Sequence, residues 1–294
     1  MAKRVYDIEV VRREKDLVGE GPAWNEDEQA LYWTDIHAPA IRRLSSDGTV
    51  ESFPMPRAVG SFVFRRGGGL IAGMKGGFCT VDLGAGSVQH IVDPEPQYPA
   101  NRLNDGKCDS HGRYWCGTLD ANQAEPTGSL YRLDPDFSVH RMDGGFTVSN
   151  GMAFTPDSTR MYFSDSRGET VYTYDFNVEA GTIRNRQVFL STRDMPGRID
   201  GATCDSDGCY WGALVHDWGV VRFDPQGRLD RMIRLPIRHP TMCTFGGPKM
   251  DILYVTSAST WMTAEEAPSQ PLAGALFAIH NTGAVGVPEP RFAG

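Results

Sequence analysis

Short apolar runs separated by polar turns recur along the whole chain, and no long amphipathic helical pattern competes with them. Each unit holds an apolar strand, a polar turn, a second strand centred on an aromatic or aliphatic residue, and a third strand that ends near a turn. The centres of the second strands are Tyr32, Ile71, Tyr114, Tyr162, Tyr210 and Tyr254. They lie 39 to 48 residues apart, which matches the period of about 40 to 50 residues of a four-stranded propeller blade.

The turns agree with this repeat, because each second strand follows a cluster of Gly, Asn, Asp, Ser or Pro. These turns lie at residues 25–27, 66–68, 110–112, 156–158, 206–208 and 246–248. The third strands are expected at residues 41–44, 78–81, 130–133, 171–174, 220–223 and 275–278. Six units predict an all-β chain, a six-bladed β-propeller that forms a single domain over residues 1–294. Residues 5–11 are expected to close the ring as the outer strand of the last blade, which also carries a polar insertion at residues 261–273.

Composition narrows the ligand class. The net charge is -8 with a pI near 5.4, and no Lys/Arg cluster is dense enough to grip a row of phosphates, so neither nucleic acid nor an anionic membrane is an expected partner. No apolar run reaches the length of about 18 to 20 residues that spans a bilayer, and residues 1–13 are charged. We therefore expect a cytoplasmic protein, a monomer or weak homodimer, with reduced cysteines and a small soluble ligand.

The polar residues that open the innermost strands form the candidate site. In a propeller these strands line the central channel, so the first side chains of each strand point into one mouth. The residues concerned are Glu20, Ser61, Arg102, Asn104, Asn150 and Asp200. Carboxylate and amide oxygens suit Ca²⁺, Mg²⁺ or Mn²⁺. An isolated Asn-Gly or Asp-Gly is more often only a turn, but recurrence at one phase of the repeat favours a shared site.

The loops between second and third strands should return to the same mouth and form the pocket wall. They are residues 35–37, 120–122, 165–167 and 216–218. Arg102 has the planar guanidinium that suits hydroxyls or a carboxylate of a ligand, although a rim salt bridge is the alternative. Trp218 is positioned to stack on a sugar ring or to cover a blade edge. His37 and His216 are proton carriers by chemistry or plain polar surface.

Other catalytic signatures are missing from the sequence. It has no Gly-x-Ser-x-Gly elbow, no His-Glu-x-x-His, no Walker-type phosphate loop and no dinucleotide fingerprint. The glycines at 67–69 belong to a hairpin tip, and no helix follows them to hold a phosphate.

Five short motifs resemble, in order, those of the SMP-30, gluconolactonase and regucalcin family of six-bladed propellers. They are Gly-Glu-Gly-Pro at 19–22, Asn-Asp-Gly-Lys at 104–107, Ser-Asn-Gly at 149–151, Asp-Gly at 200–201, and Cys-Thr-Phe-Gly-Gly at 243–247. The resemblance covers nearly the whole chain. It implies a metal-dependent sugar-lactone hydrolase in which Glu20, Asn150 and Asp200 hold one divalent cation, with Zn²⁺ and Fe²⁺ also open, while Arg102 and Asn104 contact the substrate.

The expected chemistry is hydrolysis of an aldonolactone to the open-chain aldonate. The cation polarises the lactone carbonyl and water attacks. Asp200 is the expected general base, with Glu20 as the alternative. One departure concerns specificity: where some members place an acidic substrate contact, this chain offers Asp120, Ala121 and Asn122, and Asn122 is the residue predicted to bind substrate.

Two further functional classes stay open. A non-catalytic binding propeller is suggested by Tyr-Trp-Thr-Asp at 32–35, a signature of receptor propellers that only residues 161–165 approach a second time. A paraoxonase- or phosphotriesterase-like esterase would keep the fold and the metal but change the ester.

Overall fold

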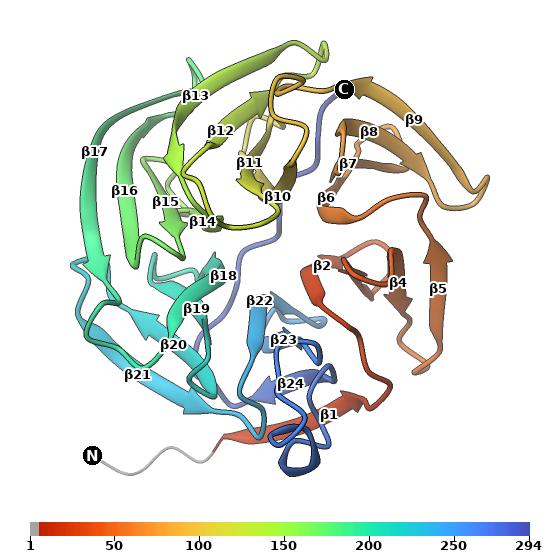
Figure 1. Cartoon of the computed structure of the whole chain (residues 1–294), viewed down its shortest axis with the longest axis vertical. Helices are drawn as coiled ribbons and strands as arrows, with labels where there is room; N and C mark the ends of the chain where they lie inside the picture. Colours follow the sequence, from red (N-terminus) through yellow and green to blue (C-terminus); the bar gives the residue numbers. More distant parts are fainter. Residues whose placement is uncertain (1–5) are drawn as a thin grey trace.

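Six antiparallel sheets of four strands surround a central channel in the computed structural model, which describes residues 6–294 (Figure 1). From inner to outer strand, the first three blades are β2 (Gly19–Asn25), β3 (Ala30–Asp35), β4 (Ala40–Leu44), β5 (Val50–Pro54); β6 (Val59–Phe64), β7 (Leu70–Met74), β8 (Gly77–Asp82), β9 (Ser87–Val92); and β10 (Asn101–Cys108), β11 (Tyr114–Asp120), β12 (Gly128–Leu133), β13 (Val139–Phe146). The fourth and fifth blades are β14 (Ser149–Phe154), β15 (Arg160–Asp165), β16 (Thr170–Asn177), β17 (Thr182–Ser191); and β18 (Arg198–Cys204), β19 (Tyr210–Val215), β20 (Gly219–Phe223), β21 (Leu229–Arg234).

The last blade joins the two ends of the chain. Its inner strands are β22 (Pro240–Gly246), β23 (Ile252–Ser257) and β24 (Leu276–His280), and its outer strand is β1 (Asp7–Arg12), which pairs antiparallel with β24. The predicted closure of the ring is confirmed, although Val5, the start of the predicted strand, lies outside the described residues. The insertion between β23 and β24 holds η1 (Ala267–Ser269), a 3-10 helix and the one helix among residues 6–294.

Burial explains why the repeat was visible in the sequence. The second strands are buried on both faces, whereas the outer strands β5 and β9 contain only exposed and half-buried side chains. Large aromatic residues, such as Trp33, Trp115 and Trp211, are fully buried between the sheets. The predicted all-β six-bladed propeller is therefore confirmed, with every predicted second-strand centre on a second strand.

A register shift interrupts each of the six inner strands near its start. The shifts lie between Glu20 and Ala23, Val59 and Ser61, Leu103 and Gly106, Asn150 and Ala153, Ile199 and Ala202, and Pro240 and Cys243. An extra residue at such a point bends the strand and re-aims the neighbouring side chain. The bulges therefore direct residues at equivalent positions toward one mouth of the channel.

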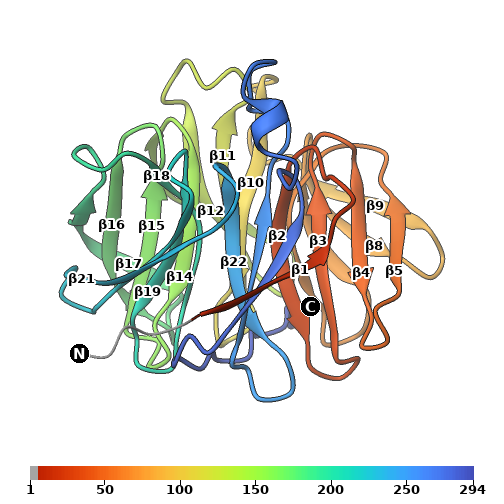
Figure 2. The ribbon, with the colours of Figure 1, turned by 90° about the horizontal axis from the view of Figure 1, so that it is seen from below.

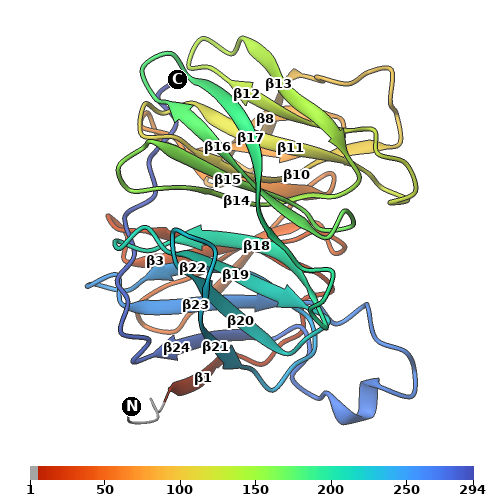
Figure 3. The same ribbon diagram turned by 90° about the vertical axis from the view of Figure 1, so that its left-hand side faces the viewer.

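The opposite mouth is crossed by the C-terminal tail, residues 284–294. Backbone hydrogen bonds fix it to three blades: Ser206 N–H donates to Val285 O at 2.8 Å, Phe292 N–H to Phe64 O at 2.8 Å, and Ala293 N–H to Gly112 O at 3.0 Å. The tail and the 267–269 helix lie on opposite faces of the ring (Figures 2 and 3). We call the end toward which the bulges direct their residues the pocket mouth, and the end crossed by residues 284–294 the tail mouth.

The structure also bears on the expectations about the cysteines and about membrane-spanning segments. All six cysteines are free and buried, in agreement with reduced thiols. Among residues 6–294, no helix is long and apolar enough to cross a membrane.

Candidate metal and substrate site

The pocket mouth opens into a cavity of about 360 Å³. The inner strands contribute Glu20, Arg102, Asn104, Asn150, Arg198 and Asp200, the ends of second strands contribute Leu119 and Val215, and the surrounding loops contribute Val18, Ile36, Gln123, Val148, Ser166, Arg167, His216 and Trp261. Five of the six entrance residues predicted from the repeat therefore meet in one pocket. The sixth, Ser61, instead donates to Asn104 O and bonds the Tyr114 hydroxyl at 2.6 Å, so it joins two blades.

Glycines beside the entrance residues make this convergence possible. Gly21 and Gly151 both have φ +55°, a conformation that L side chains rarely adopt. A Cβ at Gly151 would also lie 2.5 Å from the Tyr210 hydroxyl, and one at Gly201 would lie 2.3 Å from Met242. The two interpretations of Glu-Gly, Asn-Gly and Asp-Gly are thus compatible, since the glycine permits the turn and its neighbour faces the pocket.

A chain of hydrogen bonds connects the entrance residues of three blades. Arg102 Nη1 donates to Asn104 Oδ1 at 2.6 Å, and Asn104 Nδ2 donates to Asn150 Oδ1 at 2.7 Å. Asn150 Nδ2 donates in turn to Asp200 Oδ1 at 2.6 Å. Asn150 Nδ2 also donates to Ser166 Oγ at 3.0 Å, and this hydroxyl donates to Ile199 O at 2.6 Å. Each side chain is therefore oriented by its neighbour before any ligand arrives.

The carboxylates at the pocket mouth are buried close to one another. Glu20 is 8% and Asp200 6% exposed. Burial raises the pKa of Asp200 to about 8, with the charge of Asp105 adding to the effect. Burial, followed by the charges of Asp200 and Asp105, raises the pKa of Glu20 well above its usual range. Arg102 opposes both shifts, but one guanidinium faces the two carboxylates of Glu20 and Asp200, so the site favours an additional positive charge.

The donor set fits a hard divalent cation. Glu20 and Asp200 present carboxylate oxygens and Asn150 an amide oxygen, the ligands that Ca²⁺, Mg²⁺ and Mn²⁺ prefer. No group of three or more His, Cys, Asp or Glu suited to a metal exists among the described residues, so any cation here needs the amide as well as the two carboxylates. Asn150 Oδ1 accepts from Asn104, and Asn150 Nδ2 donates to Asp200. These two hydrogen bonds fix the orientation of the amide.

The aspartates of the return loops support the wall rather than line it. Asp35 accepts backbone N–H groups of Val18, His37 and Ala38 at 3.1 to 3.2 Å. Asp165 accepts those of Thr147, Val148 and Gly168 at 3.0 Å. These carboxylates fold their own loops.

The third-blade loop contains Asp120 and Asn122, the two polar residues considered for a specificity contact. Asp120 accepts the backbone N–H groups of Asn122 at 3.0 Å and Ala124 at 3.1 Å. Asn122 Nδ2 also bonds Asp120, at 3.3 Å, and neither residue lines the pocket. Gln123 does line it. Gln123 could not be identified from the repeat, because the loop begins with a tight turn whose side-chain directions follow no strand alternation.

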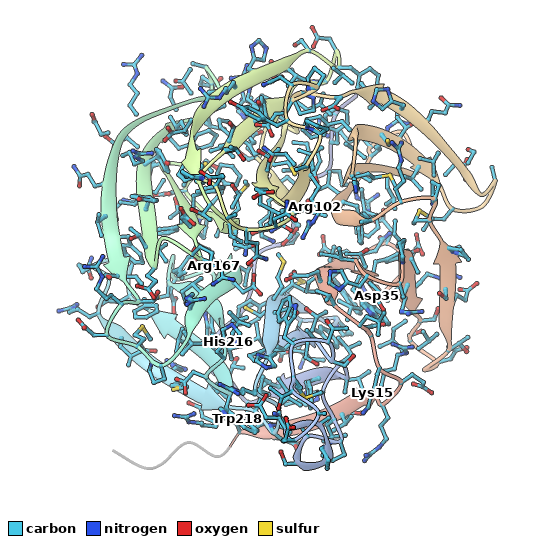
Figure 4. The ribbon with its side chains drawn as sticks, viewed as in Figure 1. Lys15, Asp35, Arg102, Arg167, His216 and Trp218 are labelled. Atoms are coloured by element: carbon cyan, nitrogen blue, oxygen red, sulfur yellow. The ribbon has the colours of Figure 1, made fainter. Side chains whose placement is uncertain are left out.

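The aromatic residue at the pocket is not the predicted one. Trp218 lies away from the channel in the region of the outer strands, whereas Arg102, Arg167 and His216 surround it (Figure 4). Trp261, from the insertion, lines the pocket instead. Of the two interpretations of Trp218, stacking on a ligand and covering a blade edge, the structure does not support the first, because Trp218 does not line the pocket. Of the two predicted proton carriers, His37 is exposed outside the lining and His216 is part of it.

Comparison with known proteins identifies the family. Residues 18–259 match the model of the SMP-30/gluconolactonase/LRE-like region. The chain is 37% identical over 289 residues to a 6-deoxy-6-sulfogluconolactonase of Pseudomonas putida, covering 98% of this chain and 99% of that one, and 33% identical over 291 residues to regucalcin of Danio rerio, covering 98% of each. A solved luciferin-regenerating enzyme superposes with a TM-score of 0.92 at 26% identity, covering 99% of this chain and 100% of that one. The chain belongs to the SMP-30/gluconolactonase/LRE-like family.

Proposed function

We propose that the protein hydrolyses a sugar lactone to the open-chain aldonate with the help of one divalent cation. The observation that carries the proposal is the convergence of Glu20, Asn150 and Asp200, from three blades, beside Arg102 and Asn104 in one open cavity. The relative from Pseudomonas putida is named as a lactonase, which supports the reaction class. Glu20, Asn150 and Asp200 are the proposed metal ligands.

Arg102 and Asn104 are proposed to hold the sugar. Arg102 is fixed through its hydrogen bond to Asn104, and Asn104 through Asn150, so a substrate bound by this pair is positioned relative to the metal ligands. The guanidinium keeps further N–H donors for ring hydroxyls or the carbonyl side of the lactone. When bound, a divalent cation supplies a Lewis acid for the lactone carbonyl and stabilises the negative charge that develops on its oxygen.

Asp200 is the proposed general base. It takes a proton from water as the water oxygen forms a bond to the carbonyl carbon, and the bond from that carbon to the ring oxygen then breaks. Asp200 then gives this proton to the ring oxygen, which leaves as a hydroxyl, and the product acid ionises to the aldonate, so one lactone and one water give one aldonate and one proton. Asp200 suits this step by its position, because its carboxylate lines the cavity and is oriented by the hydrogen bond from Asn150. Glu20, which lines the same cavity, is the second candidate.

The third-blade loop is the proposed specificity element. Asn122 is the residue predicted from sequence to contact substrate, and Gln123 is its neighbour at the pocket wall. Because Asn122 already bonds Asp120, a direct contact requires that side chain to turn toward the ligand, whereas Gln123 needs no such change.

Proton release during hydrolysis gives a direct assay. Aldonolactones, aryl esters and organophosphates would each be offered to the protein dialysed against chelator and then restored with Ca²⁺, Mg²⁺, Mn²⁺, Zn²⁺ or Fe²⁺. We expect turnover of aldonolactones with restored metal and slow or no turnover of the other esters. Preferential hydrolysis of organophosphates or aryl esters would support the esterase alternative. Metal binding without hydrolysis of any ester would support the binding propeller.

A further inference from the structure

A second charged group lies on the pocket wall, apart from the proposed metal ligands. Arg167 and Arg198 line the cavity together with His216 and Gln123. They come from the third, fourth and fifth blades, so the group is assembled by the fold rather than by one stretch of sequence. Arg167, Arg198 and His216 have no role in the lactone chemistry proposed above, which uses Arg102 as its guanidinium, and Gln123 enters it only as a contact of the pocket wall.

Both arginines are tied in sequence to residues of the metal site. Arg198 precedes Asp200 by two positions in β18, and both side chains line the cavity although a bulge interrupts the strand between Ile199 and Ala202. Arg167 follows Ser166, whose hydroxyl accepts from Asn150 at 3.0 Å. A ligand whose reactive carbonyl lies at Asp200 thus shares the cavity with these two guanidinium groups.

The positive charge on this wall is weakly neutralised. Among residues 6–294, Arg167 has no carboxylate within 4.0 Å, and its Nε donates to Gln123 Oε1 at 3.1 Å. Arg198 Nε has one carboxylate partner, Glu169 Oε1, at 3.6 Å. Burial, and then the charges of Arg198, Arg238 and Arg167, lower the pKa of His216. A protein of net charge -8 thus keeps a local excess of positive charge beside its pocket.

We propose that Arg167 and Arg198 form an anion subsite for the end of the lactone remote from its carbonyl. This inference rests on the proposed function and names its substrate class: aldonolactones whose terminal carbon carries a sulfonate, phosphate or carboxylate. A planar guanidinium donates two parallel N–H groups to such an oxyanion. Gln123, already bound to Arg167, contributes its amide N–H, and His216 and Trp261 form the neighbouring wall.

The test compares matched lactones that differ at one carbon. The metal-restored wild-type protein is assayed on an aldonolactone with a terminal CH₂OH and on the same lactone with terminal sulfonate, phosphate or carboxylate. We expect kcat/KM for the anionic lactones to be about 10- to 100-fold higher, mainly through KM, and this preference to shrink as salt is added. The three anionic arms identify which oxyanion the subsite prefers.

Substitutions show which residues cause the preference for anionic lactones. Arg167→Gln, Arg198→Gln and the double variant are expected to reduce the ratio of anionic to neutral kcat/KM about 10-fold each and further together. Glu169→Gln, which removes the carboxylate partner of Arg198, should raise that ratio about two- to fivefold. Arg193→Gln is the matched control, because Arg193 is 80% exposed, approaches the same Glu169 at 4.0 Å and does not line the pocket.

A binding measurement keeps this inference separate from the proposed function. The open-chain sulfonated and neutral aldonates are titrated into the metal-restored protein by calorimetry, which needs no turnover. Tighter binding of the sulfonated aldonate, weakened by Arg198→Gln and Arg167→Gln, supports the subsite even if no lactone is hydrolysed. Equal binding of both aldonates, or equal kcat/KM for neutral and anionic lactones, overturns it while leaving lactone hydrolysis intact.

Discussion

The pocket mouth and the tail mouth lie at opposite ends of one channel, and they differ in whether their buried charged groups are paired. Strand β10 reaches both, with Arg102 at one end and Lys107 at the other. At the tail mouth Lys107 pairs with Glu289 of the C-terminal tail. Burial lowers the pKa of Lys107, but the charges of Glu289 and then Asp105, which lies between the two mouths, outweigh burial and raise it. At the pocket mouth the carboxylates of Glu20 and Asp200 face a cavity.

The charges at the tail mouth stabilise the fold, whereas those at the pocket mouth are available to a ligand. Residues 284–294 cover the tail mouth, where the ammonium has its carboxylate partner, so that end stabilises the ring. The pocket mouth has an excess of carboxylate, and its pKa values are raised by burial. Paired charge at one end and unbalanced charge at the other is the arrangement expected if only the second end binds a cation.

Asp200→Ala should produce the largest effect at the pocket mouth. Loss of a metal ligand and proposed base is expected to reduce kcat/KM on an aldonolactone by about 10³-fold or more, with weaker metal binding by calorimetry. The unfolding midpoint without metal should stay the same or rise, because a buried carboxylate with a raised pKa is removed. Wild-type turnover by this variant would contradict its assignment.

Lys107→Met should act on stability at the tail mouth. The variant leaves Glu289 and Asp105 without their ammonium partner, and breaking such a buried pair costs about 3 kcal/mol in free energy of unfolding, measured in urea. Glu289→Gln is the milder control, since the Glu289 side chain is 22% exposed against 7% for Lys107. A loss of metal affinity larger than the loss of stability would show that the two mouths are not separate.

Arg102→Ala should raise KM for the lactone about 10- to 100-fold with a smaller effect on kcat. The reason is that Arg102 is proposed to hold substrate rather than metal, and a lost hydrogen bond from a charged donor costs about 1.5 to 3 kcal/mol. Steady-state kinetics at saturating metal gives the split. A kcat that falls as far as kcat/KM, with KM unchanged, would place Arg102 in the chemical step instead.

His239 should make the pocket side sensitive to acid. Among residues 6–294, neither ring nitrogen of this buried histidine has a hydrogen-bond partner, and burial, then the charges of His216 and Arg238, lower its pKa to about 4. Since the unfolded chain takes up the proton near pH 6.5, the stabilisation is complete above that pH and is lost as pH falls from 6.5 to 4, by about 1 to 2 kcal/mol. Urea unfolding across this range should show the slope in wild type and in the control His111→Gln, and His239→Phe should reduce it. An unchanged slope in His239→Phe would assign the effect to other groups.

Asn122→Ala and Gln123→Ala should give the smallest effects. If Gln123 is the wall contact, Gln123→Ala raises KM about threefold, whereas Asn122→Ala changes it by less than about twofold. The reverse order would restore Asn122 as the substrate contact predicted from sequence.

The parts of the protein that follow the repeat could be predicted from the sequence. Glu20, Asn150 and Asp200 occupy one phase of six similar units, so their meeting follows from the fold. Features outside the period could not be found in this way. Trp261 lies in an insertion with no counterpart in other blades, and Gln123 extends from a turn. The tail at 284–294 is held by backbone hydrogen bonds and by a few buried side chains such as Phe292, which do not follow the period of the repeat.

Metal dependence of lactone hydrolysis tests the central claim most directly. The initial rate of proton release from an aldonolactone is measured with wild-type protein stripped by chelator, and again after a divalent cation is restored. If the cation is catalytic, we expect a rate near background for the stripped protein, full recovery on restoring metal, and no recovery for Asp200→Ala. A stripped wild-type protein that hydrolyses the lactone at its full rate would contradict the proposal that Glu20, Asn150 and Asp200 hold a catalytic cation.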